Sequence, residues 1–468
     1  MGDVIVYRVG ADGEPKFPAD FEVVKKAVLQ VTDIKNNNNK YYAIELHEGK
    51  GKYRVFTHYG RTDDLDTNPN AGARENRYCS SLSEAEALYG KIYKEKTSPR
   101  KGYKELSLAS SKIGSAKSVG QSVGAIDDKT LKKLATKEDK KANAKPAILL
   151  PSEIQELVSY LYSEATNALV STVNASITAN GIETPLGVLT IGQIDKGQAV
   201  LDDIAKALGK KKKDQDELEQ LSGDFYTLIP HKFGRSREAV QAAVILDGNK
   251  VAEKNDTLQL MRDMLNVNGK SNVLVNPEVE GKYQALKCAI ESVSAGKRKE
   301  ITEFVEKSVV RSYSKVKVKN VWQLCRSDEH TNYDTKIGND KLLLHGSSAK
   351  NWVGILSRGI LLPKVVVTLG VHRTDAGWLG SGIYFGNAAC TASGYAAPGK
   401  KGTGFMTVAS VALGKMKDYS KITYGLSEPP AGFDSCHGVR GTQFADDEFV
   451  IYKQNQQKME YLVEFASK

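Results

Sequence analysis

The sequence predicts a multidomain α+β protein, in which a β-rich domain with one helix precedes a helical region and then a region that mixes helices and strands. Three observations support this prediction. The chain has 468 residues, more than one hydrophobic core usually organises. Its hydrophobic pattern changes twice, from short alternating runs to helical spacing and then to a mixture of both. A stretch rich in Ser, Ala, Gly and Lys separates the first two parts.

Residues 1–106 are predicted to form the β-rich domain. Short β-like runs such as "YYAIELHE" and "YRVFTHYG" alternate with turn clusters such as "KNNNNK". The stretch "SLSEAEALYGKIYKEKT" has the pattern of a helix, with Ser83 as its cap, Glu84 and Glu86 in its first turn and lysines near its end.

Residues 107–146 are predicted to be a flexible basic linker. The stretch contains almost no aromatic residues and ends at Pro146. Two roles are open for it. It is either a solvated tether or a segment that contacts DNA, because non-specific phosphate contacts need only positive charge.

Residues 147–275 carry helical patterns almost throughout. One predicted helix starts at Pro151 and Ser152 and places Ile154, Leu157, Val158 and Leu161 on one face. Residues 276–468 mix helices with strand candidates such as "KLLLHG", "FMTVASVAL", "EFVIY" and "MEYLVEF". No internal repeat of about 20 to 50 residues is apparent, which argues against solenoids and propellers.

The composition narrows the classes of function. A net charge of +10 and a pI near 9.0 indicate polyanionic partners. Five scattered cysteines without a C-x-x-C pair argue against zinc fingers, a disulfide framework and a metal site of that kind. No apolar run approaches the ~20 residues of a membrane span, so a membrane partner is not expected.

Common nucleotide-binding and hydrolase motifs are absent. The stretch "GWLGSGIYFG" lacks the last glycine of G-x-G-x-x-G, and the sequence contains no P-loop and no H-E-x-x-H. A different feature stands out at residues 341–363. The apolar run Leu342 to Leu344 stops at His345-Gly346-Ser347, and a short predicted helix follows, with Gly359 near its end. The polar groups there either form an ordinary turn or meet a ligand.

Several ordered motifs resemble those of the poly(ADP-ribose) polymerases. They are "LLLHGSSAKNWVGILSRGI", "GSGIYFGNAACTASGYA", "VALGKM", "FDSCHGV" and "DEFVIYKQNQQKMEYLVEF". Upstream, "PLGVLTIGQIDKGQAVLDDI" and "LSGDFYTLIPHKFG" are similar to that family's helical regulatory domain, and "YYAIELHEGKGKYRVFTHYGRTDD" to its nucleic-acid-sensing WGR domain. The resemblance implies WGR, linker, regulatory and catalytic parts at 1–106, 107–146, 147–275 and 276–468, with a mixed α/β catalytic domain built on antiparallel sheets.

The resemblance also implies a substrate, NAD+, and no metal. Breaking the bond between nicotinamide and ribose develops positive charge on the sugar, so a site must grip the ribose and place negative charge nearby. By resemblance, His345 and Ser347 bind ribose hydroxyls, and Gly346 offers its backbone to the carboxamide. A glycine suits this role because no Cβ obstructs a close ligand approach.

Three further residues receive roles by resemblance. Tyr384 is expected to form a second wall of the pocket, and Tyr395 to stack on the nicotinamide ring. Glu448 is expected to be the catalytic carboxylate, which holds the ribose 2′-OH, stabilises the cation and orients the acceptor, so that His345, Tyr384 and Glu448 form the catalytic set.

The sequence departs from the family pattern at the nicotinamide end. The family has a serine eight residues after the equivalent of Tyr384, whereas this chain has Ala392 there and Ser393 next to it. Ser393 is therefore the candidate that binds the carboxamide in its place. The sequence also reads Gly380-Ser381-Gly382 where many members have G-K-G.

A second departure concerns DNA. Tyr59-Gly60-Arg61 stands where the WGR domain has its Trp-Gly-Arg. Tyrosine can still stack on a nucleotide and Arg61 can still bind phosphate, so these three residues are the candidate DNA contacts.

Together these features predict an ADP-ribosyltransferase that is activated by DNA strand breaks and builds poly(ADP-ribose) on acceptor proteins, itself included. Two alternatives remain open: a mono-ADP-ribosyltransferase of proteins or DNA ends, and a catalytically inactive scaffold that binds DNA ends. The expected location is the nucleus, or the nucleoid or cytoplasm for a bacterial source.

Overall fold

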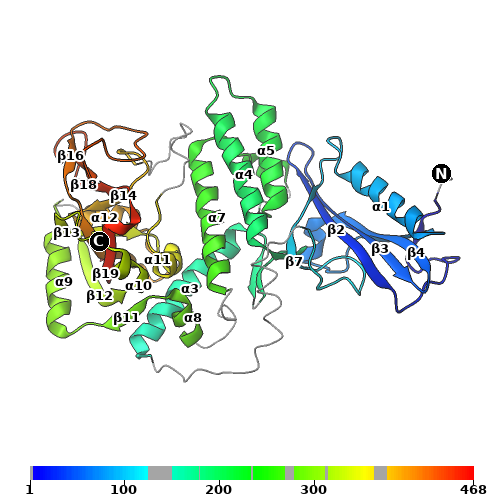
Figure 1. Cartoon of the computed structure of the whole chain (residues 1–468), viewed down its shortest axis with the longest axis horizontal. Helices are drawn as coiled ribbons and strands as arrows, with labels where there is room; N and C mark the ends of the chain where they lie inside the picture. Colours follow the sequence, from blue (N-terminus) through cyan, green and yellow to red (C-terminus); the bar gives the residue numbers. More distant parts are fainter. Residues whose placement is uncertain are drawn as a thin grey trace. The chain divides into compact units, whose positions relative to one another are not determined.

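The computed structural model describes residues 4–124, 150–178, 180–232, 236–268, 279–310, 315–362 and 377–467. The chain forms two compact units (Figure 1). The first contains Met1–Lys145 and Val170–Leu265, and the second contains Pro146–Leu169 and Asn266–Lys468. The predicted multidomain α+β class is confirmed. Within the described ranges, no helix combines the length and the apolar character that crossing a bilayer requires.

The first unit opens with a six-stranded antiparallel sheet in the order β1-β5-β4-β3-β2-β6. Its strands are β1 (Tyr7–Arg8), β2 (Glu22–Asp33), β3 (Asn38–Gly49), β4 (Lys52–Arg61), β5 (Ala73–Cys79) and β6 (Lys104–Glu105). Helix α1 (Leu82–Lys96) covers one face, where Leu29, Ile44 and Val55 pack against Ala85 and Tyr89. This helix was predicted, but Ser83 as its cap is wrong.

Ser81 caps α1 instead. Its hydroxyl accepts from the backbone N–H of Glu84, and the Glu84 carboxylate accepts in return from the N–H of Ser80, at 2.8 Å. The pattern of a serine followed three residues later by a glutamate is a capping box, and it fixes the start of the helix one residue after Ser81.

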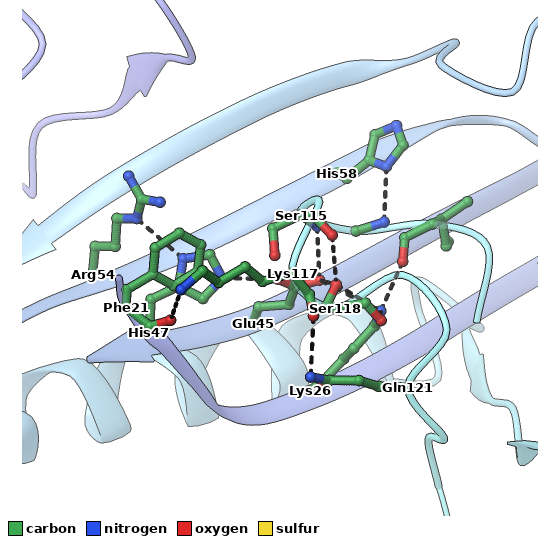
Figure 2. A network of polar contacts seen from close by, with 12 residues as sticks. Phe21, Lys26, Glu45, His47, Arg54, His58, Ser115, Lys117, Ser118 and Gln121 are labelled. Atoms are coloured by element: carbon green, nitrogen blue, oxygen red, sulfur yellow. Dashed lines mark hydrogen bonds and ion pairs between the residues drawn. The ribbon is translucent and has the colours of Figure 1, made fainter. Parts of the chain in front are cut away.

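The opposite face of this sheet carries a buried polar network (Figure 2). Lys26 and Glu45 lie on neighbouring strands with nitrogen and oxygen 3.6 Å apart, and their side chains are almost fully buried. Burial lowers the pKa of Lys26 to about 8, against the opposing pull of Glu45. His47 bonds to the second Glu45 oxygen at 2.8 Å. A buried ion pair of this kind is costly unless further hydrogen bonds satisfy both charges.

Residues 107–124 supply those hydrogen bonds. The Lys26 ammonium donates to the carbonyls of Ile113 and Ser118, at 2.8 and 3.0 Å. Glu45 accepts from the N–H of Ser115 at 3.0 Å and from the Ser118 hydroxyl. The predicted flexible linker is therefore wrong for residues 107–124, because this segment folds onto the sheet and completes a buried charge cluster. Residues 125–146, the rest of that prediction, lie outside the described residues.

Gly114 provides a test of this network. Its φ is +119°, and an added Cβ would overlap with Glu45 and crowd Ser118 and Lys26. Gly114→Ala should therefore loosen residues 107–124 by about 1–3 kcal/mol, measured as faster amide exchange in that segment. Gly120→Ala is the matched control, because Gly120 also has a positive φ but its Cβ would meet no atom within 4 Å. Equal effects in both variants would refute the steric argument.

Residues 107–124 also contact the part of the first unit that contains its helices. Strand β7 (Leu108–Ser111) joins a four-stranded sheet, order β7-β10-β9-β8, with β10 (Gly187–Leu189), β9 (Gly181–Glu183) and β8 (Ser176–Thr178). Ser107 bonds through its N–H to Gln193 and through its carbonyl to Thr190, the cap of α4. The helices α4 (Ile191–Leu208), α5 (Gln215–Leu228), α6 (Arg237–Ala242) and α7 (Gly248–Asn268) follow.

The second unit contains a nine-stranded sheet in the order β11-β12-β19-β15-β13-β14-β18-β17-β16. Its strands are β11 (Ala289–Ser292), β12 (Val316–Cys325), β13 (Asp340–Ser347), β14 (Ile383–Gly386), β15 (Gly404–Ala412), β16 (Met416–Tyr419), β17 (Ser435–Gly438), β18 (Glu448–Ile451) and β19 (Gln457–Ser467). All neighbours pair antiparallel except β16 and β17.

Six helices of the described residues accompany this sheet. They are α3 (Ser152–Thr172, with residues up to Leu169 in this unit), α8 (Val279–Leu286), α9 (Ala295–Lys307), α10 (Ser327–Asn332), α11 (Trp352–Arg358) and α12 (Ala389–Tyr395). Leu344, Met406, Val408 and Val463 form the centre of a core that α9 and α12 help to enclose.

Candidate functional site

The predicted site residues meet where two neighbouring strands separate. Strands β13 and β14 pair only through Leu344 and Gly386, and Gly386 also pairs with Glu448 on β18. His345 follows Leu344 directly, and its Nδ1 lies 2.8 Å from the carbonyl oxygen of Tyr384. The pairing thus brings His345, Tyr384 and Glu448 from three strands to one part of the sheet.

The hydrogen bond of His345 defines its chemistry. A carbonyl can only accept, so Nδ1 must carry the proton and Nε2 keeps its lone pair. Burial lowers the pKa of His345, which favours this neutral form at pH 7. His345 therefore offers a fixed acceptor that suits a sugar hydroxyl.

Gly346 and Ser347 are held by their surroundings. A Cβ on Gly346 would overlap with the carbonyl oxygen of Ala392 in α12, so only glycine allows this close approach. The Ser347 hydroxyl accepts from the Asn351 amide at 3.1 Å, and the Ser347 carbonyl accepts from the Trp352 indole N–H at 3.0 Å. The hydroxyl proton of Ser347 is not used in the Asn351 bond.

Tyr384 shapes the loop before β14. Its hydroxyl donates to the carbonyl of Gly380 at 2.8 Å and accepts from the N–H of Leu379 at 2.9 Å. Burial raises its pKa, so the phenol stays protonated at physiological pH. The ring is thereby fixed in orientation, as the wall of a pocket requires.

The carboxyl group of Glu448 has a strongly raised pKa. Burial raises its pKa to about 7, and the charge of Asp446 adds to the shift. Within the part of the chain that the structure describes, no hydrogen bond to the Glu448 carboxylate is found. A buried carboxylate with a pKa near neutrality is the kind of group that active sites use.

Helix α12 carries the two predicted nicotinamide contacts. Tyr395 lies at its C-terminal end and is 55% exposed, which leaves its ring accessible. The Ser393 hydroxyl donates to the Cys390 carbonyl at 3.0 Å within the helix. Ser393 can therefore still accept a hydrogen bond, but its own proton is engaged. Ala392, at the usual serine position, is buried.

The candidate DNA contacts lie at the end of β4 in the first unit. Arg61 is 41% exposed in its side chain, and its contacts with the described residues are long, 3.5 Å each, to Asp63 and the carbonyl of Asn37. Tyr59 stacks on Tyr42 at 5.3 Å, and its hydroxyl donates to Glu75 at 2.7 Å. One face and the hydroxyl of Tyr59 are thus used internally, while the Arg61 side chain stays partly exposed.

Gly60 has a packing reason of its own. An added Cβ would come within 3.1 Å of the Gly72 Cα and 3.2 Å of the Tyr41 hydroxyl, which is closer than ordinary packing. The glycine thus lets the loop before β5 lie against β4, next to Arg61.

Two residues beside Glu448 received no role from the sequence. Asp447 accepts from His437 Nε2 at 3.0 Å and from the N–H of Arg440 at 3.0 Å. Asp446 accepts from the Thr391 hydroxyl in α12. The sequence does not show that the strands containing "FDSCHGV" and "DDE" pair, so it could not predict these contacts. Among the described residues, no cluster of three or more His, Cys, Asp or Glu side chains is arranged to hold a metal ion.

Three family models match consecutive parts of the chain. The WGR domain model matches residues 25–109, the regulatory domain of poly(ADP-ribose) polymerase matches 149–272, and its catalytic domain matches 298–443. Glu448 lies just beyond the last of these ranges.

Individual relatives agree with these models. Protein mono-ADP-ribosyltransferase PARP4 from Homo sapiens is 37% identical over 326 residues, which cover 68% of this chain. Protein mono-ADP-ribosyltransferase PARP3 from Mus musculus is 26% identical, covering 93% of this chain and 87% of the relative. Poly [ADP-ribose] polymerase 2 from Homo sapiens is 24% identical, covering 94% and 79%. The chain spans only 18% of the length of human PARP4 and 16% of mouse PARP4.

Proposed function

Because this chain belongs to the poly(ADP-ribose) polymerase family, we propose that it transfers ADP-ribose from NAD+ to an acceptor and releases nicotinamide. The glycosidic bond breaks with its electron pair going to the nicotinamide nitrogen. The ribose carbon then gains a bond to the acceptor, whose proton is lost. The convergence of His345, Tyr384 and Glu448 on one part of the sheet supports this proposal.

Each residue has a role that suits its environment. His345 Nε2 accepts from a ribose hydroxyl, because its Nδ1 proton is committed to Tyr384. Glu448 accepts from the 2′-OH and supplies negative charge near the developing cation, where desolvation makes that charge count most. Tyr395 covers the nicotinamide ring by stacking. Gly346 and Ser347 complete the grip on carboxamide and ribose.

We further propose that the product is a polymer. Growth requires a sugar hydroxyl to act as the nucleophile, and Glu448 is placed to polarise it. The relatives support both outcomes, since two carry the name mono-ADP-ribosyltransferase and one the name poly [ADP-ribose] polymerase. Incubation with labelled NAD+ distinguishes the three candidate functions. Long adducts would support a polymerase, and single adducts would support a mono-ADP-ribosyltransferase. The absence of any adduct would support a catalytically inactive scaffold that binds DNA.

Strand breaks in DNA are the proposed activator, and the nucleus is the proposed location. The support is the WGR model match together with the net charge of +10. Within the first unit, the β2–β3 hairpin beside Arg61 also touches helix α5, where the N–H of Thr32 donates to the Thr227 hydroxyl at 2.7 Å. A ligand at Arg61 would therefore act on a surface that is joined to the helices.

Arg61→Ala should weaken binding of nicked DNA and reduce stimulation by it, because the guanidinium fork is lost as a phosphate contact. Activity without DNA should not change. The measurement compares DNA affinity by fluorescence anisotropy with nicotinamide release, with and without nicked duplex. Arg100→Ala, which removes an exposed arginine of the same domain, is the matched control. If Arg61→Ala retains wild-type stimulation, Arg61 is not a DNA contact.

A further inference from the structure

Glu448 is held in place by its backbone and its neighbours. Its carboxylate makes no hydrogen bond with any described residue, so its position depends on the strand start that carries it. The two residues just before that start are both hydrogen-bonded. Asp446 is tied to Thr391 of α12, and Asp447 is tied to the N–H of Arg440 and to the Asn387 amide, at 3.0 and 3.2 Å.

His437 is the residue that contacts both sequence neighbours of Glu448. Its Nε2 lies 3.0 Å from Asp447 Oδ1, and its ring lies flat on Phe449, with centroids 4.7 Å apart and planes 5° apart. The pairing of β17 with β18 explains this arrangement, because His437 stands directly opposite Phe449. A displacement of His437 would therefore act on the residues before and after the carboxylate.

Asp418 on β16 fixes the other end of the imidazole. Its Oδ1 lies 2.9 Å from His437 Nδ1, and β16 pairs with β17 so that the two residues are opposite. Carboxylates only accept, so each of these two bonds needs a proton on the ring nitrogen that makes it. The His437 side chain is 15% exposed and Asp418 is 69% exposed, which makes the His437–Asp447 bond the better shielded of the two.

We propose that His437 is a positioning residue for Glu448, holding the start of β18 through Asp447 and Phe449 so that the carboxylate stays where the reaction needs it. The proposal rests on the proposed transferase function, since it assigns a role within that reaction. His437 does not touch the substrate in this proposal. Its effect should therefore fall on the chemical step rather than on NAD+ binding, for which His345, Ser347 and Tyr395 remain.

His437→Phe tests the proposal because phenylalanine keeps the stacking on Phe449 and loses both hydrogen bonds. The kcat for nicotinamide release should fall about 10- to 100-fold, as for a small misplacement of a catalytic group. KM for NAD+ should change by less than about threefold. His437→Gln, whose amide can still donate to Asp447, should recover part of the loss. Asp418→Asn keeps an acceptor for Nδ1 and is the matched control, with near wild-type kcat expected.

Two results would overturn the proposal. One is a folded His437→Phe variant with wild-type kcat. The other is a loss of kcat that glutamine does not relieve at all. If His437→Phe lowers the melting temperature but leaves kcat unchanged, the proposal also fails, and His437 has a purely structural role.

A second measurement does not need the transferase activity. If the wild-type protein releases no nicotinamide, the proposed function fails, but the position of Glu448 can still be followed by its titration. The melting temperature of each protein is compared with that of its Glu448→Gln variant at about pH 5 and about pH 8. The same comparison in the His437→Phe background completes a double-mutant cycle, which isolates the coupling between His437 and Glu448.

The cycle has a definite expected result. Burial and Asp446 raise the pKa of Glu448 to about 7, and burial together with the charge of Glu448 in turn raises the pKa of Tyr384. Both groups stay in place throughout the cycle. If His437 holds the strand start, its loss lets Glu448 reach solvent, and the stabilisation by Glu448→Gln at high pH should shrink. An unchanged stabilisation would show that His437 does not position Glu448.

Discussion

Glu448→Gln should lower the rate of nicotinamide release by ~10²–10³, the usual cost of losing a charged transition-state contact. The amide has nearly the same shape but no negative charge for the ribose cation or the acceptor. Folding and NAD+ binding should remain largely intact, because Gly346, Ser347 and Tyr395 still contact the substrate. Polymer growth should fall further than single transfer or NAD+ hydrolysis, since attack by a sugar hydroxyl depends most on the polarising group.

The measurement is product length on a denaturing gel beside total nicotinamide release. His345→Ala is the comparison variant, and it should impair NAD+ binding and all reactions together, because the Nε2 acceptor is lost. Wild-type chain length at a wild-type rate in Glu448→Gln would mean that Glu448 is not the catalytic carboxylate.

The pKa of Glu448 adds a pH signature to this variant. The reaction needs the ionised carboxylate, so kcat/KM of the wild type should rise with pH through a midpoint near 7 and level off at higher pH. The stability of the folded protein should change with pH in the opposite direction. Because the folded pKa lies above the ordinary 4.5, the stability due to Glu448 is present below pH 4.5 and is lost as the pH rises to about 7. Glu448→Gln should therefore gain up to about 3 kcal/mol over the wild type across that window.

Local patterns predicted the elements of the second unit well. The strand candidates "KLLLHG", "FMTVASVAL", "EFVIY" and "MEYLVEF" correspond to β13, β15, β18 and β19. The predicted end of the helix after β13 is also confirmed, since Gly359 follows α11 with a φ of +86°. Period-2 and period-3.6 patterns are local properties, so they are readable without knowing which strands become neighbours.

Contacts that depend on strand pairing were not predictable in the same way. His437 and Asp447 meet only because β17 and β18 pair across a loop, and nothing in "FDSCHGV" specifies that register. Lys26 and Glu45 resemble solvent-facing charges in an alternating strand. Their burial follows from residues 107–124, whose Ser- and Gly-rich composition suggested flexibility but whose backbone groups satisfy the ion pair.

Deleting residues 147–270 should give high activity without DNA, because this helical region is expected to restrain the NAD+ site until DNA favours its locally unfolded state. The second unit contains contacts suited to such restraint. The Glu164 carboxylate of α3 accepts from the N–H of Lys400 at 2.9 Å, and the Tyr160 ring lies 6.0 Å from Phe405. These contacts brace the loop that directly follows Tyr395. A coupling of typical size would raise basal activity about 5- to 150-fold.

A milder variant keeps the test sharp if the deletion disturbs folding. Glu164→Ala combined with Tyr160→Phe removes the polar contacts of α3 to residues 400 and 401 without opening a large cavity. It should raise nicotinamide release without DNA severalfold, and Glu156→Ala, an exposed change on the same helix, should not. Amide exchange in residues 152–169 should also rise when nicked duplex is added. If the folded deletion variant still requires DNA, the restraint does not reside in these helices, and control must act directly on the catalytic sheet.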